Sequence, residues 1–208
     1  MTSGSSGVPE KLYMKPVAVA VTVLLASLAA FALVRAKFTG KAVFEIFWML
    51  PIALPQVAIG IGMLRLLQVF TAVPAFIGLL MVHVTVTLPF CIGLLRASVQ
   101  QLDMAQEEAA GSLGAGPLAR LWYVILPGLA PGLAAAAIVA VLLSFEEVTI
   151  TSFLTTARMT TLPVRIYAEA SYSLEPTVYA ISTLIIGTTI AAMLLLGRLV
   201  RLDRVFAR

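Results

Sequence analysis

Charged residues are scarce in this chain of 208 residues. Only 12% of the residues are Asp, Glu, Lys or Arg, 61% are hydrophobic, and the mean hydropathy is +1.03. Soluble domains contain about 25% charged residues and are about half apolar. The composition therefore argues against a soluble globular protein and favours one built mostly from membrane-spanning segments.

Histidine and cysteine are almost missing as well. The single cysteine, Cys91, cannot form a disulfide within the chain. The single histidine, His83, has no second ligand at metal-binding spacing, so no metal site is expected, and a hydrogen bond between helices is favoured over a functional role. The net charge of +4 includes no basic block, which argues against nucleic-acid binding.

Catalytic motifs are also absent. The sequence contains no G-x-x-x-x-G-K-[ST], no G-x-S-x-G and no H-E-x-x-H. We therefore expect no catalytic residue and no ATP site of the P-loop type. If the protein performs work, the energy must come from a separate subunit.

Five apolar segments are long enough to cross a bilayer, which takes about 20 residues. They predict an all-α, polytopic membrane protein. A polar N-terminal segment (1–15) precedes a transmembrane domain (16–208). The segments are 16–34, 44–64, 73–95, 127–145 and 178–199. The second contains Pro51 and Pro55, which predict a kink.

Positive charge predicts the orientation. With five spans, the termini lie on opposite sides of the membrane. One side then holds Arg35, Lys37, Lys41, Arg96, Arg120, Arg198, Arg201, Arg204 and Arg208, and the other holds Lys11, Lys15, Arg65, Arg158 and Arg165. The side with more Lys and Arg faces the cytoplasm. The N-terminus is therefore expected outside, and the polar segment 97–126 inside.

Segment 97–126 is the one extended polar stretch between apolar runs. We expect a helix from Ser98 to Gly114, a break at Gly114 and Gly116-Pro117, and a second helix up to Leu126 that Pro127 ends. Composition alone leaves open an amphipathic helix lying at the membrane surface. Glu45, four residues after Lys41, is expected to pair with it on a helix surface.

Residues 108–127 read EAAGSLGAGPLARLWYVILP. This stretch resembles the EAA loop of ABC importer permeases, which is E-A-A, three residues, G, nine residues, then I-x-L-P. The matching residues are Glu108, Ala109, Ala110, Gly114, Leu126 and Pro127, with Val124 in place of Ile. The resemblance implies that this loop is the surface that a cytoplasmic ATPase holds.

The resemblance extends over nearly the whole chain. Residues 35–41 match the family turn R-x-x-F-x-G-[KR], and SFEEVTITSFL and TLPVRIY are similar to segments of the polyamine (spermidine/putrescine) type permeases. Related importers carry ferric iron, thiamine or phosphonates. Polyamine-type permeases usually have six spans, and the helix that would precede Pro16 is absent here.

The resemblance implies a permease subunit in the bacterial inner membrane, surrounded by lipid. Its implied partners are ABC ATPase subunits, which bind ATP and Mg, a second permease subunit and an external substrate-binding protein. No cofactor is expected in this chain. An intramembrane enzyme or a passive channel is the alternative, but few acidic or Ser/His groups cluster within the spans.

Phe145, Glu146 and Glu147 end the fourth predicted span and are the candidates for a solute path. Carboxylates at the edge of the hydrocarbon usually face a cavity or a partner, and a negative charge there suits a cationic solute. Neighbouring helical residues point about 100° apart, so both carboxylates cannot face the same way. Alternatively, they mark the exit into water, or Arg158 and Arg165 neutralise them. Tyr167, Tyr172 and Tyr179 fit either a cation site or an interfacial belt.

Overall fold

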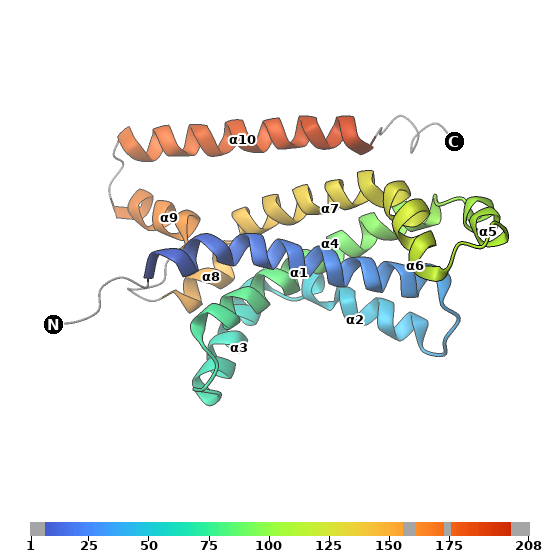
Figure 1. Cartoon of the computed structure of the whole chain (residues 1–208). Helices are drawn as coiled ribbons and strands as arrows, with labels where there is room; N and C mark the ends of the chain where they lie inside the picture. The colour runs from blue at the N-terminus through green and yellow to red at the C-terminus, as the bar shows by residue number, and fades with distance from the viewer. Residues whose placement is uncertain (1–6, 156–160, 173–175, 201–208) are drawn as a thin grey trace.

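The computed structural model describes residues 7–155, 161–172 and 176–200, and within these ranges it contains helices and connecting turns but no strand. Three long helices, α1 (Gly7–Arg35), α4 (Ala75–Gln100) and α7 (Leu126–Glu146), form the centre of the molecule (Figure 1). The predicted all-α fold is confirmed.

The remaining helices surround this centre or lie at its ends. Short helices α5 and α6 lie at one end, together with the turn from α1 to α2, whereas α8 and α9 lie at the opposite end (Figure 1). Their bounds are α2 (Lys41–Ala53), α3 (Gln56–Val69), α5 (Met104–Ser112), α6 (Pro117–Arg120), the π-helical turn η1 (Leu121–Ile125), α8 (Thr149–Leu154), α9 (Leu162–Tyr172) and α10 (Pro176–Val200).

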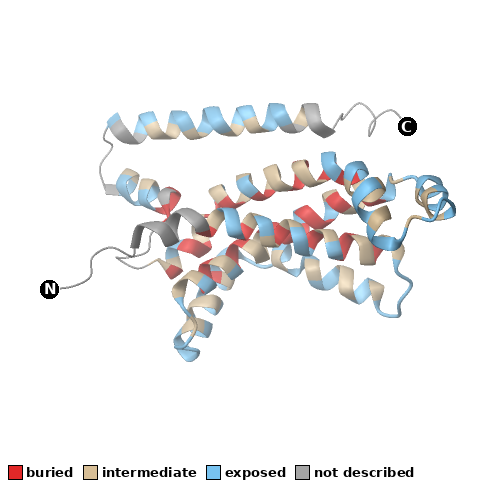
Figure 2. Ribbon diagram, viewed as in Figure 1, coloured by how far each residue is buried: buried red, intermediate tan, exposed pale blue. Residues whose placement is uncertain are grey.

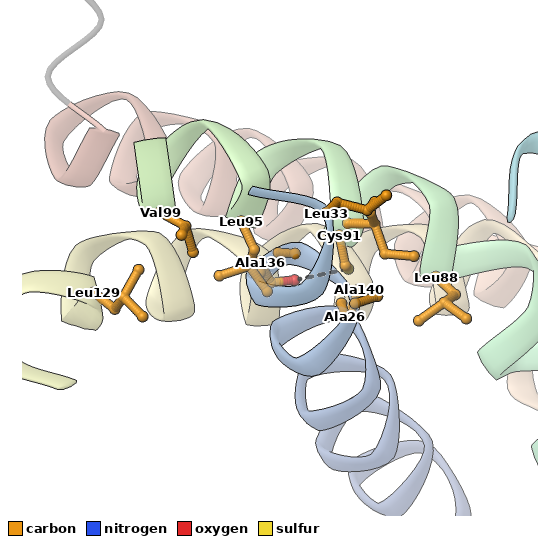
Figure 3. Packing of buried hydrophobic residues seen from close by; sticks show 12 residues of the cluster. Ala26, Leu33, Leu88, Cys91, Leu95, Val99, Leu129, Ala136 and Ala140 are labelled. Atoms are coloured by element: carbon orange, nitrogen blue, oxygen red, sulfur yellow. Dashed lines mark hydrogen bonds between the residues drawn. The ribbon is translucent and has the colours of Figure 1, made fainter. Parts of the chain in front are cut away.

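Small side chains allow the three central helices to pack closely. The main buried cluster combines Ala26 and Ala30 of α1, Cys91 of α4, and Ala136 and Ala140 of α7 (Figure 3). In a membrane, small residues at helix interfaces let the backbones approach, and this gives van der Waals contact that lipid cannot match. The Cys91 thiol also donates a 3.5 Å hydrogen bond to the carbonyl oxygen of Ala136.

Two buried polar contacts connect the same helices. The hydroxyl groups of Thr22 on α1 and Thr87 on α4 are 3.0 Å apart, and His83 Nδ1 on α4 is 3.0 Å from Ser144 Oγ on α7. The expected interhelical hydrogen bond of His83 is confirmed. Such contacts are worth about 0.6–2 kcal/mol each in membrane proteins. They therefore set the register of the helices more than they add to the overall stability of the bundle.

The second apolar segment is not one continuous helix. It consists of α2 and α3, which meet at an angle of 100°. Pro55 is responsible, since it lacks an N–H group and forces the residue before it out of the helical region. Leu54 is accordingly extended, with φ −88° and ψ 140°. Pro51, in contrast, lies inside α2 without breaking it.

Among the described residues, three helical stretches are long and apolar enough to cross a membrane, namely Met14–Arg35, Ala75–Gln100 and Pro117–Glu146. The bent α2–α3 pair adds a fourth if it is one broken span, and Tyr179–Leu195 of α10 is a shorter apolar stretch. These stretches overlap the five predicted segments, although the helix Pro117–Glu146 begins well before the predicted segment 127–145. The count of five spans stays a prediction. Much of α10 is not covered by the rest of the chain (Figure 2), which leaves its apolar surface for lipid or another subunit.

We expect Gly132→Ala to destabilise the bundle. A Cβ atom at Gly132 would lie 2.6 Å from Ser98 Cβ across the α4–α7 interface, and overpacking of this kind costs about 1–3 kcal/mol. That cost outweighs the preference of a helix for Ala over Gly, which is about 1 kcal/mol. Thermal unfolding of the purified protein in detergent measures the change. Gly93→Ala on α4 is the control, because open space surrounds its Cβ position. An equal melting temperature for the two variants would contradict the predicted close approach.

Candidate functional site

The predicted coupling loop contains a separate short helix. We predicted one helix from Ser98 to Gly114, and this is wrong, because α4 ends at Gln100 and α5 begins at Met104. Asp103 separates them. It has extended backbone angles, and its Oδ1 accepts a 2.9 Å hydrogen bond from the Ala105 N–H. Asp is a preferred N-cap residue because its carboxylate satisfies a free N–H of the first turn.

The end of α5 explains the spacing of the E-A-A-x-x-x-G pattern. Gly114 has φ +86°, the left-handed conformation that glycine adopts without strain. Its N–H donates to the carbonyl oxygen of Gly111, and the N–H of Ala115 donates to that of Ala110, both over 3.0 Å. This is the Schellman arrangement, in which the glycine follows the helix and the last carbonyl groups are satisfied. The predicted helix break at Gly114 is confirmed.

Residues 113–116, which join α5 to α6, form an elbow in the chain. After this elbow, the chain is helical from Pro117 to Glu146. Pro117 begins α6, as predicted. Pro127 does not end this helix, which corrects the prediction. In the turn η1 just before it, the N–H of Leu126 bonds the carbonyl oxygen of Leu121, five residues back. A π-helical turn is wider than an α-helical one. The helix therefore accommodates the ring of Pro127, which would otherwise clash with the preceding turn.

The predicted coupling residues lie mostly on the surface of the chain. Glu108, Ala109, Gly114 and Pro127 are exposed, whereas Ala110 and Leu126 are half-buried. Large apolar side chains are exposed in the same segment: Leu113 (89% exposed), Leu118, Trp122 and Tyr123. Trp and Tyr are frequent at membrane interfaces, while an exposed Leu at a polar elbow is typical of a protein contact.

At the opposite end of the bundle, Glu146 and Glu147 point to different environments, as predicted, although Glu147 follows the end of α7 in an extended conformation rather than continuing the helix. Glu147 is buried, and its carboxylate accepts hydrogen bonds from the N–H groups of Ile150 and Thr151 (2.7 and 2.9 Å) and from the Thr151 hydroxyl (2.5 Å). Those bonds hold the first turn of α8. Glu146 is exposed, so its carboxylate is the one available to a solute.

Glu146 borders a cavity of about 780 Å³ lined by residues of α7, α9 and α10. This volume is within the usual range for ligand sites. Phe145 and Tyr167 line the cavity together with Glu146. Arg165 is paired with Glu169 at 3.0 Å and does not neutralise Glu146. Arg158 and the side chain of Tyr172 lie outside the described residues, and Tyr179 is exposed.

Lys15 was counted in the sequence only as a topology signal, yet it lines a second cavity of about 560 Å³ between α1 and α7. Its Nζ lies 4.3 Å from the centre of the Phe145 ring, a cation–π contact, and has no hydrogen-bond partner in the described part of the chain. In the sequence, the only sign of this cavity-lining role was a lysine directly before the apolar run that begins at Pro16.

Two ion pairs join helices near the predicted coupling end. Glu45 on α2 does not pair with Lys41 as expected. Its carboxylate instead lies 2.8 Å from Arg96 on α4. Arg35 at the end of α1 pairs with Glu107 on α5. No pattern in the sequence had indicated this pair.

Comparison with known proteins identifies the class. Residues 22–202 match the model of one protein family, which is described as "Binding-protein-dependent transport system inner membrane component". The chain belongs to this family. It is a multi-pass inner-membrane permease subunit of an ABC importer.

Among its relatives is the spermidine/putrescine transport system permease protein PotC of Escherichia coli strain K12, 29% identical over 87% of this chain and 68% of PotC. The putrescine transport system permease protein PotI of the same strain is 30% identical over 79% of this chain and 61% of PotI. A crystal structure described as an amino acid ABC transporter with histidines has a TM-score of 0.60 at 21% identity, covering 94% of this chain and 91% of that one. It supports the fold.

We expect Gly114→Ala to impair coupling. The left-handed conformation costs a non-glycine residue about 1–2 kcal/mol, and no neighbouring atom within 4 Å adds a steric effect. The elbow should shift, and transport per ATP hydrolysed should fall in the reconstituted importer. Gly116→Ala is the matched control, because Gly116 also has free space around it but a φ of −66°. Equal transport by the two variants would argue against the elbow's role.

Topology is testable at Ser112, which is exposed on α5. In a Cys91→Ser background, Ser112→Cys should not react with an impermeant thiol reagent added to intact spheroplasts, but should react in inverted vesicles. Labelling from the outside would reverse the predicted orientation.

Proposed function

We propose that this permease carries a polyamine, putrescine or spermidine, and that α5 is the surface through which partner ATPases drive it. The two named relatives are polyamine permeases, and this supports the choice of solute. The single structural observation in its favour is Glu146, an exposed carboxylate that borders a 780 Å³ cavity together with Phe145 and Tyr167.

The chemistry of this cavity suits an alkyl ammonium ion. A carboxylate attracts the positive charge, and it does so more strongly in a site with low dielectric constant than in water. Aromatic ring faces add about 0.5–2 kcal/mol for each ammonium group they contact. The many apolar residues of the cavity, such as Ile166, Ile185 and Ile186, fit the methylene segments between the amines.

The proposed mechanism divides the work between subunits. The partner ATPases bind ATP and Mg, and closure of their nucleotide sites moves the coupling loop, including Glu108, Ala109 and Ala110. A second permease subunit completes the path, and an external binding protein delivers the solute. In this mechanism the chain itself performs no hydrolysis. It changes between inward-open and outward-open states that bind the solute with different affinity.

A solute with an anionic group, such as a phosphonate, is the second candidate. Lys15 lines the 560 Å³ cavity, and its buried ammonium group has no hydrogen-bond partner in the described part of the chain. Buried polar groups are nearly always hydrogen-bonded. An anion in that cavity would satisfy the ammonium group.

We expect Glu146→Gln to lower putrescine uptake at least about tenfold, equivalent to about 1.4 kcal/mol, with little change in basal ATPase activity. Uptake of radiolabelled putrescine into proteoliposomes with matched protein levels measures this. Lys15→Met should leave putrescine uptake unchanged if the Glu146 cavity holds the solute.

Glu147→Gln is the contrasting variant, because its carboxylate stabilises α8. It should lower the melting temperature more than Glu146→Gln does. If Glu146→Gln takes up putrescine as well as the wild type does, Glu146 is not part of the solute path. Failure of the wild type to carry either polyamine, with binding of a phosphonate abolished by Lys15→Met, would favour the second candidate.

A further inference from the structure

Arg35 and Glu107 form a two-point ion pair between the last turn of α1 and the first half of α5. Arg35 Nη1 donates to Glu107 Oε2 over 3.1 Å, and Arg35 Nη2 donates to Glu107 Oε1 over 2.6 Å. Paired parallel bonds of this kind fix orientation as well as distance, and they are stronger than bonds between neutral groups. The pair is therefore able to transmit a rotation or displacement of α5.

The pair is partly shielded from solvent, since the side chains of Arg35 and Glu107 are 25% and 15% exposed. Exposed ion pairs contribute little because water and salt screen them. In comparison, the side chains of the Arg96–Glu45 pair are 39% and 35% exposed. The Arg35–Glu107 contact is the more sheltered of the two.

Few other contacts attach α5 to the bundle. Within the described residues, no side chain of α5 is buried, and its main packing is against α6 and η1, which follow it in the chain. The Arg120 side chain approaches Gly111 there, and its Nη1 atom lies 3.5 Å from the point where a Cβ atom on Gly111 would be. Of the ion pairs in the described ranges, the Arg35–Glu107 pair alone involves α5. It connects α5 to a helix that lies far from it in the sequence.

The partner of α5 in this pair is well placed to pass on a movement. α1 packs along α4 over much of its length. It also contributes Thr22 to the hydrogen bond with Thr87. Because the core between these helices is closely packed, a displacement at the end of α1 moves the helix as a rigid body rather than being absorbed locally.

We propose that the Arg35–Glu107 pair is a positioning contact that carries movement of α5 directly into α1. The movement then enters the bundle at two points, through the elbow into α7 and through the ion pair into α1. This inference rests on the proposed role of α5 as the surface that the ATPases move. It does not depend on which solute is carried.

A double-mutant cycle tests the pair, with Arg35→Gln, Glu107→Gln and the combined variant in the reconstituted importer. Putrescine transported per ATP hydrolysed is the measured ratio, with melting temperature recorded for each variant. Each single change should lower the ratio about fivefold or more, the lower limit of typical coupling between sites. The combined variant should fall no further than either single one, because the pair acts as a unit.

Arg96→Gln and Glu45→Gln are the matched controls, since they break an ion pair of the same residue types between α2 and α4. They should leave the ratio within about twofold of the wild type, as expected where no specific coupling is lost. Arg35→Lys keeps the charge but not the two-point geometry, so it should give an intermediate ratio.

Unchanged ratios in the single variants would overturn the inference, and so would additive losses in the combined variant. A loss of ratio that merely follows the melting temperature across all variants, controls included, would also overturn it.

If the wild type hydrolyses ATP with the partner subunits but carries no putrescine, the proposed solute fails. In that case uptake is replaced by the nucleotide-dependent thiol reactivity of Ala20→Cys in a Cys91→Ser background, since Ala20 of α1 lines the cavity between α1 and α7. The same cycle then decides the inference: a nucleotide response at Ala20 that both single variants lose supports it, and an unchanged response overturns it.

Discussion

The requirement that backbone hydrogen bonds be satisfied within the chain governs this structure. In hydrocarbon, no water is available to N–H and C=O groups, so a spanning segment must be helical. Interruptions are therefore costly, and three of those in the described residues have a local solution. Leu54 becomes extended before Pro55, the carbonyl groups at the end of α5 accept bonds from Gly114 and Ala115, and the carboxylate of Glu147 bonds the first N–H groups of α8. Glu146, at the end of α7, and the residues of the predicted coupling loop lie next to these interruptions, whereas Lys15 lies within α1.

Sequence reasoning succeeded where a residue has one physical consequence. The apolar runs predicted the long helices, and Gly114 predicted the break after α5. Glu146 and Glu147 diverge as predicted, but they do so because α7 ends between them. It failed where two consequences compete. Pro127 and Pro55 have the same missing N–H, yet a π-helical turn accommodates Pro127 whereas the chain bends by 100° at Pro55. That difference depends on the hydrogen bonding of the preceding turn, which composition does not encode.

Charged partners were the other limit of the sequence. Spacing favoured a Lys41–Glu45 pair, but tertiary packing brings Arg96 to Glu45. Arg35 and Glu107 are 72 residues apart, so no local pattern connects them. Lys15 is likewise only the edge of an apolar run in the sequence, and its place above the Phe145 ring depends on how α1 crosses α7. Which partner a long charged side chain reaches therefore depends on which helices pack together.

The two ends of the bundle differ in how firmly they hold their polar groups, and this difference suits a transporter. Glu147 is fixed by three hydrogen bonds within a few residues of chain, so the start of α8 is rigid. In contrast, no residue of α5 is buried, and its ion pair with α1 is a single one among the described residues. Elements with few buried contacts open or shift at low free-energy cost. A force applied to α5 therefore meets little resistance until it reaches Arg35 and the elbow. In the proposed mechanism, the closely packed α1, α4 and α7 then move as units, which places the change in shape at the interfaces between helices rather than within them.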